Sequence, residues 1–179
     1  MADTQGPENA AKKKKGLIAA AVLLAAAALC LWYTRPVSTE RVMDGMPVEY
    51  LTGILQTVYV ENGIGGFDIW KLDDALDADT PECREMMDIL SRATYRTHLR
   101  NLLGRWYSDR SSYEWDGSTY AFLMFTDGQD RSITFNLDQK TLRVNRSWED
   151  RSYLYTLRDP QTLSDIAALF QKYGTFQDE

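Results

Sequence analysis

Cysteine and histidine are scarce in this chain. Among 179 residues there are one histidine, His98, and two cysteines, Cys30 and Cys83. Cys30 lies inside a long apolar run, so Cys83 has no second cysteine in the remainder with which to form an intramolecular disulfide. One histidine and one thiol leave little material for a zinc site. We therefore expect a domain that folds without disulfide, metal or cofactor.

Catalytic motifs are also lacking. No serine lies in a Gly-x-Ser-x-Gly elbow, and His98 shows no spacing typical of a catalytic triad. The glycine-rich stretch "NGIGGFD" has no following Lys-Ser or Lys-Thr, so it does not match a phosphate-binding loop. These absences favour a protein that is not an enzyme.

A basic surface is missing from most of the chain. The net charge is −6. Residues 1–35 carry Lys12–Lys15 and Arg35 against Asp3 and Glu8, which gives +3 and leaves −9 for the remainder. Because phosphate contacts need a basic face, we expect no nucleic-acid partner.

A long apolar run is the strongest feature that is present. The segment from Gly16 to Tyr33 contains no charged residue. As a helix it spans roughly 27 Å, close to the thickness of a bilayer core. The lysines precede it, and only Arg35 follows closely. This pattern predicts a transmembrane helix over 16–35, a disordered cytoplasmic tail over 1–15 and an extracytoplasmic remainder.

Other roles for the apolar run stay open. Small residues at Ala25–Ala28 fit a cleaved signal peptide, although the run continues past them through Trp32. A lipoprotein signal makes Cys30 the modified residue, but Leu29 stands where a small residue is expected. Small-residue pairs such as Gly16 and Ala20 fit a structural subunit that associates through its anchor.

The remainder is predicted to form one domain with six strands and two helices. We expect a linker over 36–47, a folded domain over 48–174 and a C-terminal tail over 175–179. Strands are predicted by β-branched and aromatic patterns: 50–60, 67–72, 120–125, 132–137, 142–145 and 153–157. Thr80 and Asp159, each followed by proline, predict the starts of two helices, and Gly174 predicts the end of the second. The stretch 94–119 shows no clear pattern.

These elements predict an α+β domain, with an antiparallel sheet and both helices on one face. The stretches "FDIWKLDDALDADTPECREMMDIL" and "YLYTLRDPQTLSDIAALF" repeat an order of strand, acidic turn and helix. This order resembles small, N-terminally anchored extracytoplasmic domains of unknown function from Gram-positive bacteria. The resemblance spans about residues 48–174, contains no catalytic motif and implies no site residue.

A cluster of aromatic residues is the candidate binding site. Its proposed members are Trp106, Tyr107, Tyr113 and Trp115. Flat apolar faces beside polar groups suit an envelope protein, a peptide or a glycan. Two alternatives remain open. The rings pack within the sheet, or Asp109, Glu114 and Asp116 serve a membrane-tethered hydrolase that acts on envelope material.

Three further features have ordinary structural explanations. Asp73, Asp74, Asp77 and Asp79 precede a helix, and Asp127 and Asp130 flank a turn, so we expect capping and turn formation rather than calcium binding. Cys83 falls on the apolar stripe of its helix, which predicts a buried thiol.

Overall fold

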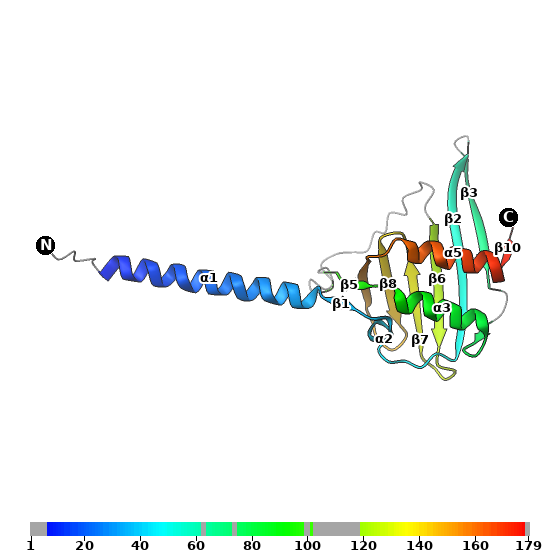
Figure 1. The fold of residues 1–179 in the computed structure, drawn as a ribbon, viewed down its shortest axis with the longest axis horizontal. Coiled ribbons are helices and arrows are strands. Elements are labelled where there is room, and N and C mark those ends of the chain that lie inside the picture. The colour runs from blue at the N-terminus through cyan, green and yellow to red at the C-terminus, as the bar shows by residue number, and fades with distance from the viewer. Residues whose placement is uncertain (1–6, 62–63, 73–74, 99–100, 102–118, 178–179) are drawn as a thin grey trace. The chain divides into compact units, whose positions relative to one another are not determined.

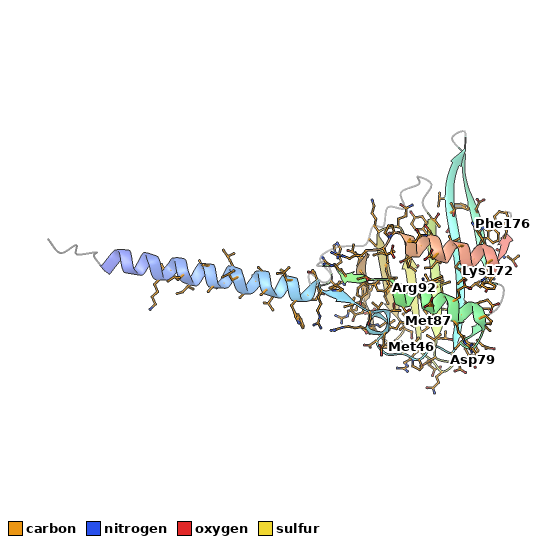
Figure 2. All side chains as sticks on the ribbon, viewed as in Figure 1. Met46, Asp79, Met87, Arg92, Lys172 and Phe176 are labelled. Atoms are coloured by element: carbon orange, nitrogen blue, oxygen red, sulfur yellow. The ribbon has the colours of Figure 1, made fainter. Side chains whose placement is uncertain are left out.

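The chain consists of two compact units, residues 1–35 and 36–179. The computed structural model describes residues 7–61, 64–72, 75–98, 101 and 119–177. In the first unit, helix α1 runs from Pro7 to Tyr33. Its segment Lys14–Tyr33 is long and apolar enough to cross a membrane and is not buried by other parts of the chain. The side chains of its residues 14–32 are exposed in this unit, and sticks project from both edges of the helix in Figure 2.

Helix α1 begins earlier than predicted. The expectation of a disordered tail over 1–15 is wrong for Pro7 to Lys15, which are helical. Alanine and lysine are strong helix formers, and a proline suits the first turn of a helix. The helix of the apolar run therefore extends back through the lysines.

An antiparallel sheet forms the framework of the second unit, as predicted, and it has ten strands among the described residues. The order of strands is β1-β5-β9-β8-β7-β6-β2-β3-β10, and β4 pairs with β2. The strands are β1 (Pro36–Val37), β2 (Tyr50–Glu61), β3 (Ile64–Lys71), β4 (Leu76–Asp77), β5 (Tyr95–Thr97), β6 (Thr119–Thr126), β7 (Ser132–Leu137), β8 (Thr141–Arg146), β9 (Ser152–Leu157) and β10 (Thr175–Gln177).

Two helices, α3 (Pro81–Arg92) and α5 (Gln161–Tyr173), cross the same face of this sheet (Figure 1). The prediction of an α+β fold with both helices on one face is therefore confirmed. The core lies between the layers. Its largest fully buried side chains include Met86 and Leu90 of α3, Phe170 of α5, and Leu51, Leu55, Leu123, Phe125, Ile133, Phe135, Leu137 and Leu142 of the sheet.

Local signals explain the helix ends. The Thr80 hydroxyl accepts a hydrogen bond from the Cys83 amide at 3.3 Å, which confirms the predicted start of α3. At the start of α5, Pro160 occupies the N-cap position, so Asp159 lies one residue before the N-cap position that was predicted for it. Its carboxylate still accepts a hydrogen bond from the Gln161 amide at 3.0 Å.

The hairpin of β2 and β3 extends beyond its neighbours (Figure 1). Pairing of β2 with β6 stops at Thr57 and Thr119, whereas pairing with β3 continues to Glu61 and Ile64. The predicted strands 50–60 and 67–72 are therefore confirmed as a hairpin, and β3 begins earlier than expected.

Residues 36–47 are part of the domain, so their prediction as a linker is wrong. They form β1, which pairs with β5, and a short helix α2 (Thr39–Val42). The side chains of Val42, Met43 and Met46 are buried. A scattered set of apolar residues without a regular period gave no local sign of this packing, which depends on contacts with distant elements.

Residues Thr175–Gln177 form β10 and pair with β3, so the prediction of a tail at this end is also wrong. Gly174 ends α5 as predicted, but it has no left-handed backbone. A Cβ at Gly174 would lie 2.7 Å from the Phe170 carbonyl oxygen and 2.9 Å from that of Lys71. Glycine is therefore needed for the close approach of α5 to β3.

Candidate functional site

The predicted aromatic cluster lies outside the described residues. This applies to Trp106, Tyr107, Tyr113 and Trp115, which are the binding candidates. It applies equally to Asp109, Glu114 and Asp116, the carboxylates of the hydrolase alternative. The structure therefore leaves both assignments as predictions.

The thiol and the imidazole occupy different environments. Cys83 is 1 % exposed on α3, as its position on the apolar stripe predicted. Burial raises the pKa of this thiol, which lowers the fraction of reactive thiolate. His98 follows β5 and is exposed. Neither observation supports a pairing of Cys83 with His98 for nucleophilic catalysis.

Asp127 is the described acidic residue with the clearest role in local structure. Among the described acidic residues, histidine and cysteines, no group of three lies close enough to hold a metal ion. The carboxylate of Asp127 accepts hydrogen bonds from the amides of Gln129 and Arg131, both at 3.1 Å, and from Arg131 Nε at 2.7 Å. Asp127 therefore organises the turn between β6 and β7.

The Asp127 carboxylate should make stability depend on pH. Its pKa is lowered chiefly by the hydrogen bond from Arg131. A lowered pKa in the folded state stabilises the protein above the pKa of the unfolded state, about 3.9, and this contribution disappears as the pH falls through the folded-state value. We expect Asp127→Asn to lower the melting temperature at pH 7, and the difference from the parent to shrink as the pH falls through the lowered folded-state pKa.

The matched control for this measurement is Asp130→Asn, an exposed position in the same turn. It should leave the pH profile of the melting temperature unchanged. A difference between parent and Asp127→Asn that stays constant from pH 7 to pH 3 would contradict the role of the ionised carboxylate.

A buried arginine links β8 to the segment that follows the apolar helix. Arg146 is 8 % exposed. Its Nη1 lies 2.7 Å from Glu149 Oε1, and its Nη2 donates to the Val42 carbonyl at 2.9 Å. The guanidinium also lies over the Tyr153 ring, 4.7 Å from the centroid. These contacts fix α2 against the sheet and have the character of a structural network.

Glu149 is the carboxylate of this network. It accepts a hydrogen bond from the hydroxyl of Tyr153, and Arg151 Nε lies 3.3 Å from Glu149 Oε2. The hydrogen bond from Tyr153, followed by those from Arg146 and Arg151, lowers the pKa of Glu149. An ionised carboxylate held by two arginines is poorly suited to act as a general acid.

A groove runs between α3 and α5. Its charged lining residues are Glu85, Arg92, Asp165 and Lys172. Lys172 Nζ lies 2.9 Å from Glu85 Oε2, and the Tyr173 hydroxyl donates to the same oxygen at 3.0 Å. Figure 2 shows Arg92 and Lys172 at opposite ends of the helical layer. Equal numbers of both charges, partly paired with each other, give this groove no preference for a charged ligand.

The second face of the sheet, opposite α3 and α5, carries unusually large apolar side chains. Directly paired residues of neighbouring strands point to the same face. On this basis its apolar members include Ile54, Val58, Phe67, Ile69, Tyr120, Phe122, Met124 and Leu154. Ile54 is 39 % exposed and Phe122 is 41 % exposed, and they are direct partners on β2 and β6. An exposed pair of this kind at the centre of a sheet suits contact with another molecule.

The charges that the described strand residues place on the second face have one sign. Among the described residues of β2, β3 and β6–β9 that point to it, Lys71 and Arg143 are charged and none is Asp or Glu. Arg96 of β5 points the same way, beside Thr156 of β9. This contrasts with the acidic balance of the whole chain. The described residues thus give the second face an apolar centre, with Lys71 of β3 and Arg143 of β8 on its two sides.

Sequence reasoning did not identify the second face. The alternating positions of each strand were visible in the sequence. However, the pairing of Ile54 with Phe122, and of Ile54 with Lys71, depends on the order and register of the strands. That order became known only from the structure.

Comparisons with protein-family models, with characterised proteins and with solved structures gave no match for this chain.

Proposed function

We propose that this chain is a single-pass membrane protein whose second unit is an extracytoplasmic binding module held close to the membrane surface. The observation that carries the proposal is the distribution of positive charge around the apolar part of α1. Four lysines precede it and one arginine follows closely. Positive residues are retained on the cytoplasmic side, which favours export of residues 36–179.

A short connection supports a role near the membrane. Helix α1 ends at Tyr33, and the folded unit starts with β1 at Pro36. The two residues between them span at most about 7 Å when extended. A domain tethered in this way meets partners of the same membrane at a high effective concentration, so that even weak binding becomes useful.

Topology is the first test. In spheroplasts, added protease should digest the second unit and leave a tag at Met1 intact, because the tag lies in the cytoplasm. Detergent lysis before digestion should expose the tag as the control. Digestion of the tag in intact spheroplasts would reverse the orientation. Release of the second unit from membranes without detergent would favour a cleaved signal peptide.

Capture of a partner is the second test. The tagged full chain is crosslinked in native membranes and recovered, beside a matched chain that keeps residues 1–35 and carries an unrelated folded domain. We expect the full chain alone to recover a membrane or envelope partner. Recovery of the same partner by both chains would instead support a structural subunit that assembles through its anchor.

A further inference from the structure

The four lysines before the apolar part of α1 form a candidate lipid site. We propose that Lys12–Lys15 bind the headgroups of anionic phospholipids, while apolar side chains one turn further along the helix contact the acyl chains of the same lipids. This site rests on the membrane anchor of the proposed function, because it needs α1 in a bilayer. It does not depend on which side of the membrane the lysines occupy.

The lysines belong to one continuous helix (Figure 1). Helix α1 runs from Pro7 to Tyr33, and Lys15 is followed directly by Gly16 and the uncharged run. At about 1.5 Å per residue, the four lysines occupy about 4.5 Å along the helix axis. When the uncharged run fills the hydrocarbon core, this short segment lies at the depth of the lipid headgroups. Successive helical residues differ by about 100° in direction, so the four positions are distributed around the helix.

Within α1, little negative charge is present to neutralise the lysines. Glu8 is the only acidic residue of this helix, and it precedes Lys12 by one turn. Lys14 and Lys15 are exposed, and the described residues of the chain do not bury the segment that follows them. Their charge is therefore open to a partner outside the chain. Each lysine that lies near an anionic membrane surface strengthens binding to that surface about fivefold.

Apolar side chains continue the face that carries Lys14. Leu17 and Ile18 follow this lysine by three and four residues, so the three side chains share one face of the helix. Val22 extends the apolar surface by a further turn beyond Ile18. All three apolar side chains are exposed. A molecule that contacts both parts of this face carries a negative group next to an apolar chain, which favours a phospholipid over a free phosphate.

The opposite end of the uncharged run differs from the lysine end. Arg35 is the nearest cation that follows the run, and its guanidinium lies over the Trp32 ring, 4.9 Å from the centroid. One cation that already contacts an aromatic ring offers less positive charge to a lipid than four lysines do. We therefore expect the preference for anionic lipid at the lysine end of α1.

The test uses the full chain in nanodiscs of phosphatidylcholine that contain a small fraction of a phospholipid with a photoreactive acyl chain. This probe is either phosphatidylglycerol, which is anionic, or phosphatidylcholine, which has no net charge. We expect phosphatidylglycerol to crosslink about fivefold more, the effect of roughly one lysine per bound lipid. Peptide mapping should place the additional adducts within residues 14–22 and not within residues 29–35.

Two variants with the same change in charge locate the site. Replacing all four residues of Lys12–Lys15 by glutamine should make the two lipid probes crosslink equally. The control replaces four exposed cations of the second unit by glutamine and should keep the preference: Arg84, Arg92, Arg151 and Lys172. Thermal melting of the second unit confirms that each variant is folded.

Several outcomes would overturn the proposal. Equal crosslinking of the two probes to the parent chain would show that there is no selectivity for the anionic headgroup. A preference that survives replacement of the lysines would place the site elsewhere, and equal losses in both variants would assign it to the net charge of the chain. Competition by glycerol 3-phosphate as strong as that by unlabelled phosphatidylglycerol would indicate a site for the free anion.

The lipid site and the proposed function can fail separately. Both leaflets of a nanodisc have the same composition, so the preference is measured whichever way the chain crosses the bilayer. A preference for phosphatidylglycerol together with digestion of the Met1 tag in intact spheroplasts would support the lipid site and overturn the proposed orientation. Absence of crosslinks from α1 to either probe would show that α1 lies outside the bilayer and would overturn both.

Discussion

Replacing Phe170 by alanine should lower the free energy of unfolding by about 3–5 kcal/mol. The Phe170 ring is fully buried. It fills the space above Gly53 of β2, where a Cβ would lie 2.7 Å from its Cζ atom. The ring thus occupies a site that the sheet leaves open for it. Its removal creates a cavity, because the backbone at Gly53 is held by pairing with Leu123 of β6 and by a hydrogen bond from the Leu72 amide to its carbonyl oxygen, so that it cannot collapse into the space.

The measurement is denaturant unfolding of the full chain in detergent micelles, followed by near-ultraviolet circular dichroism. Phe176→Ala is the matched control. Phe176 is 43 % exposed on β10 and contacts Trp70, with 5.3 Å between the ring centroids. It should cost about 1 kcal/mol or less. Equal losses for the two variants would show that Phe170 is not a core residue.

Replacing Arg146 by alanine should lower the free energy of unfolding by about 3 kcal/mol, the lower end of the range for breaking a buried ion pair. The variant leaves the Glu149 carboxylate without its closest cation and the Val42 carbonyl without its side-chain donor. Because Val42 belongs to α2, the variant should loosen the packing of α2 on the sheet as well as lower the stability of the whole domain. Limited proteolysis should cut residues 36–46 faster in the variant than in the parent.

Arg151→Ala is the control for this prediction. Arg151 contacts the same Glu149 and the same Tyr153 ring, but its side chain is 67 % exposed. Exposed ion pairs contribute about 0–1 kcal/mol, so the control should change stability little and leave the proteolysis of 36–46 unchanged. Similar losses of unfolding free energy in the two variants would show that the burial of Arg146 does not increase the contribution of its contacts to stability.

Phe170 and Arg146 stabilise different parts of the fold. Phe170 joins a helix to the centre of the sheet. Arg146 joins β8 to helix α2 through the Val42 carbonyl. Sites that share no contact partner usually contribute independently, and the contacts described for Phe170 and Arg146 have no residue in common. The double variant should therefore lose the sum of the two free energies to within about 0.5 kcal/mol.

The sequence by itself determined the elements with strong local signals. The uncharged run of 16–33 indicated an apolar helix outside a soluble core. A helix of a soluble domain would carry a polar face toward solvent, and this run has none. Thr80 and Pro81 determined where α3 begins, since a hydroxyl acceptor and a residue without an amide hydrogen suit the first turn. Alternating apolar residues determined the strands β7 and β8, and a continuous apolar run determined β6. Two strand–helix units indicated an α+β domain with both helices on one face.

Only the tertiary structure decided what depends on distant partners. Residues 36–47 lack a regular apolar period, and they fold because β5, α3 and Arg146 supply their contacts from 50 to more than 100 residues away. The strand at Thr175–Gln177 forms because its backbone pairs with β3 at the edge of the sheet. The second face was decided in the same way. Strand order and register, which no local pattern encodes, bring Ile54 and Phe122 together between Lys71 and Arg143.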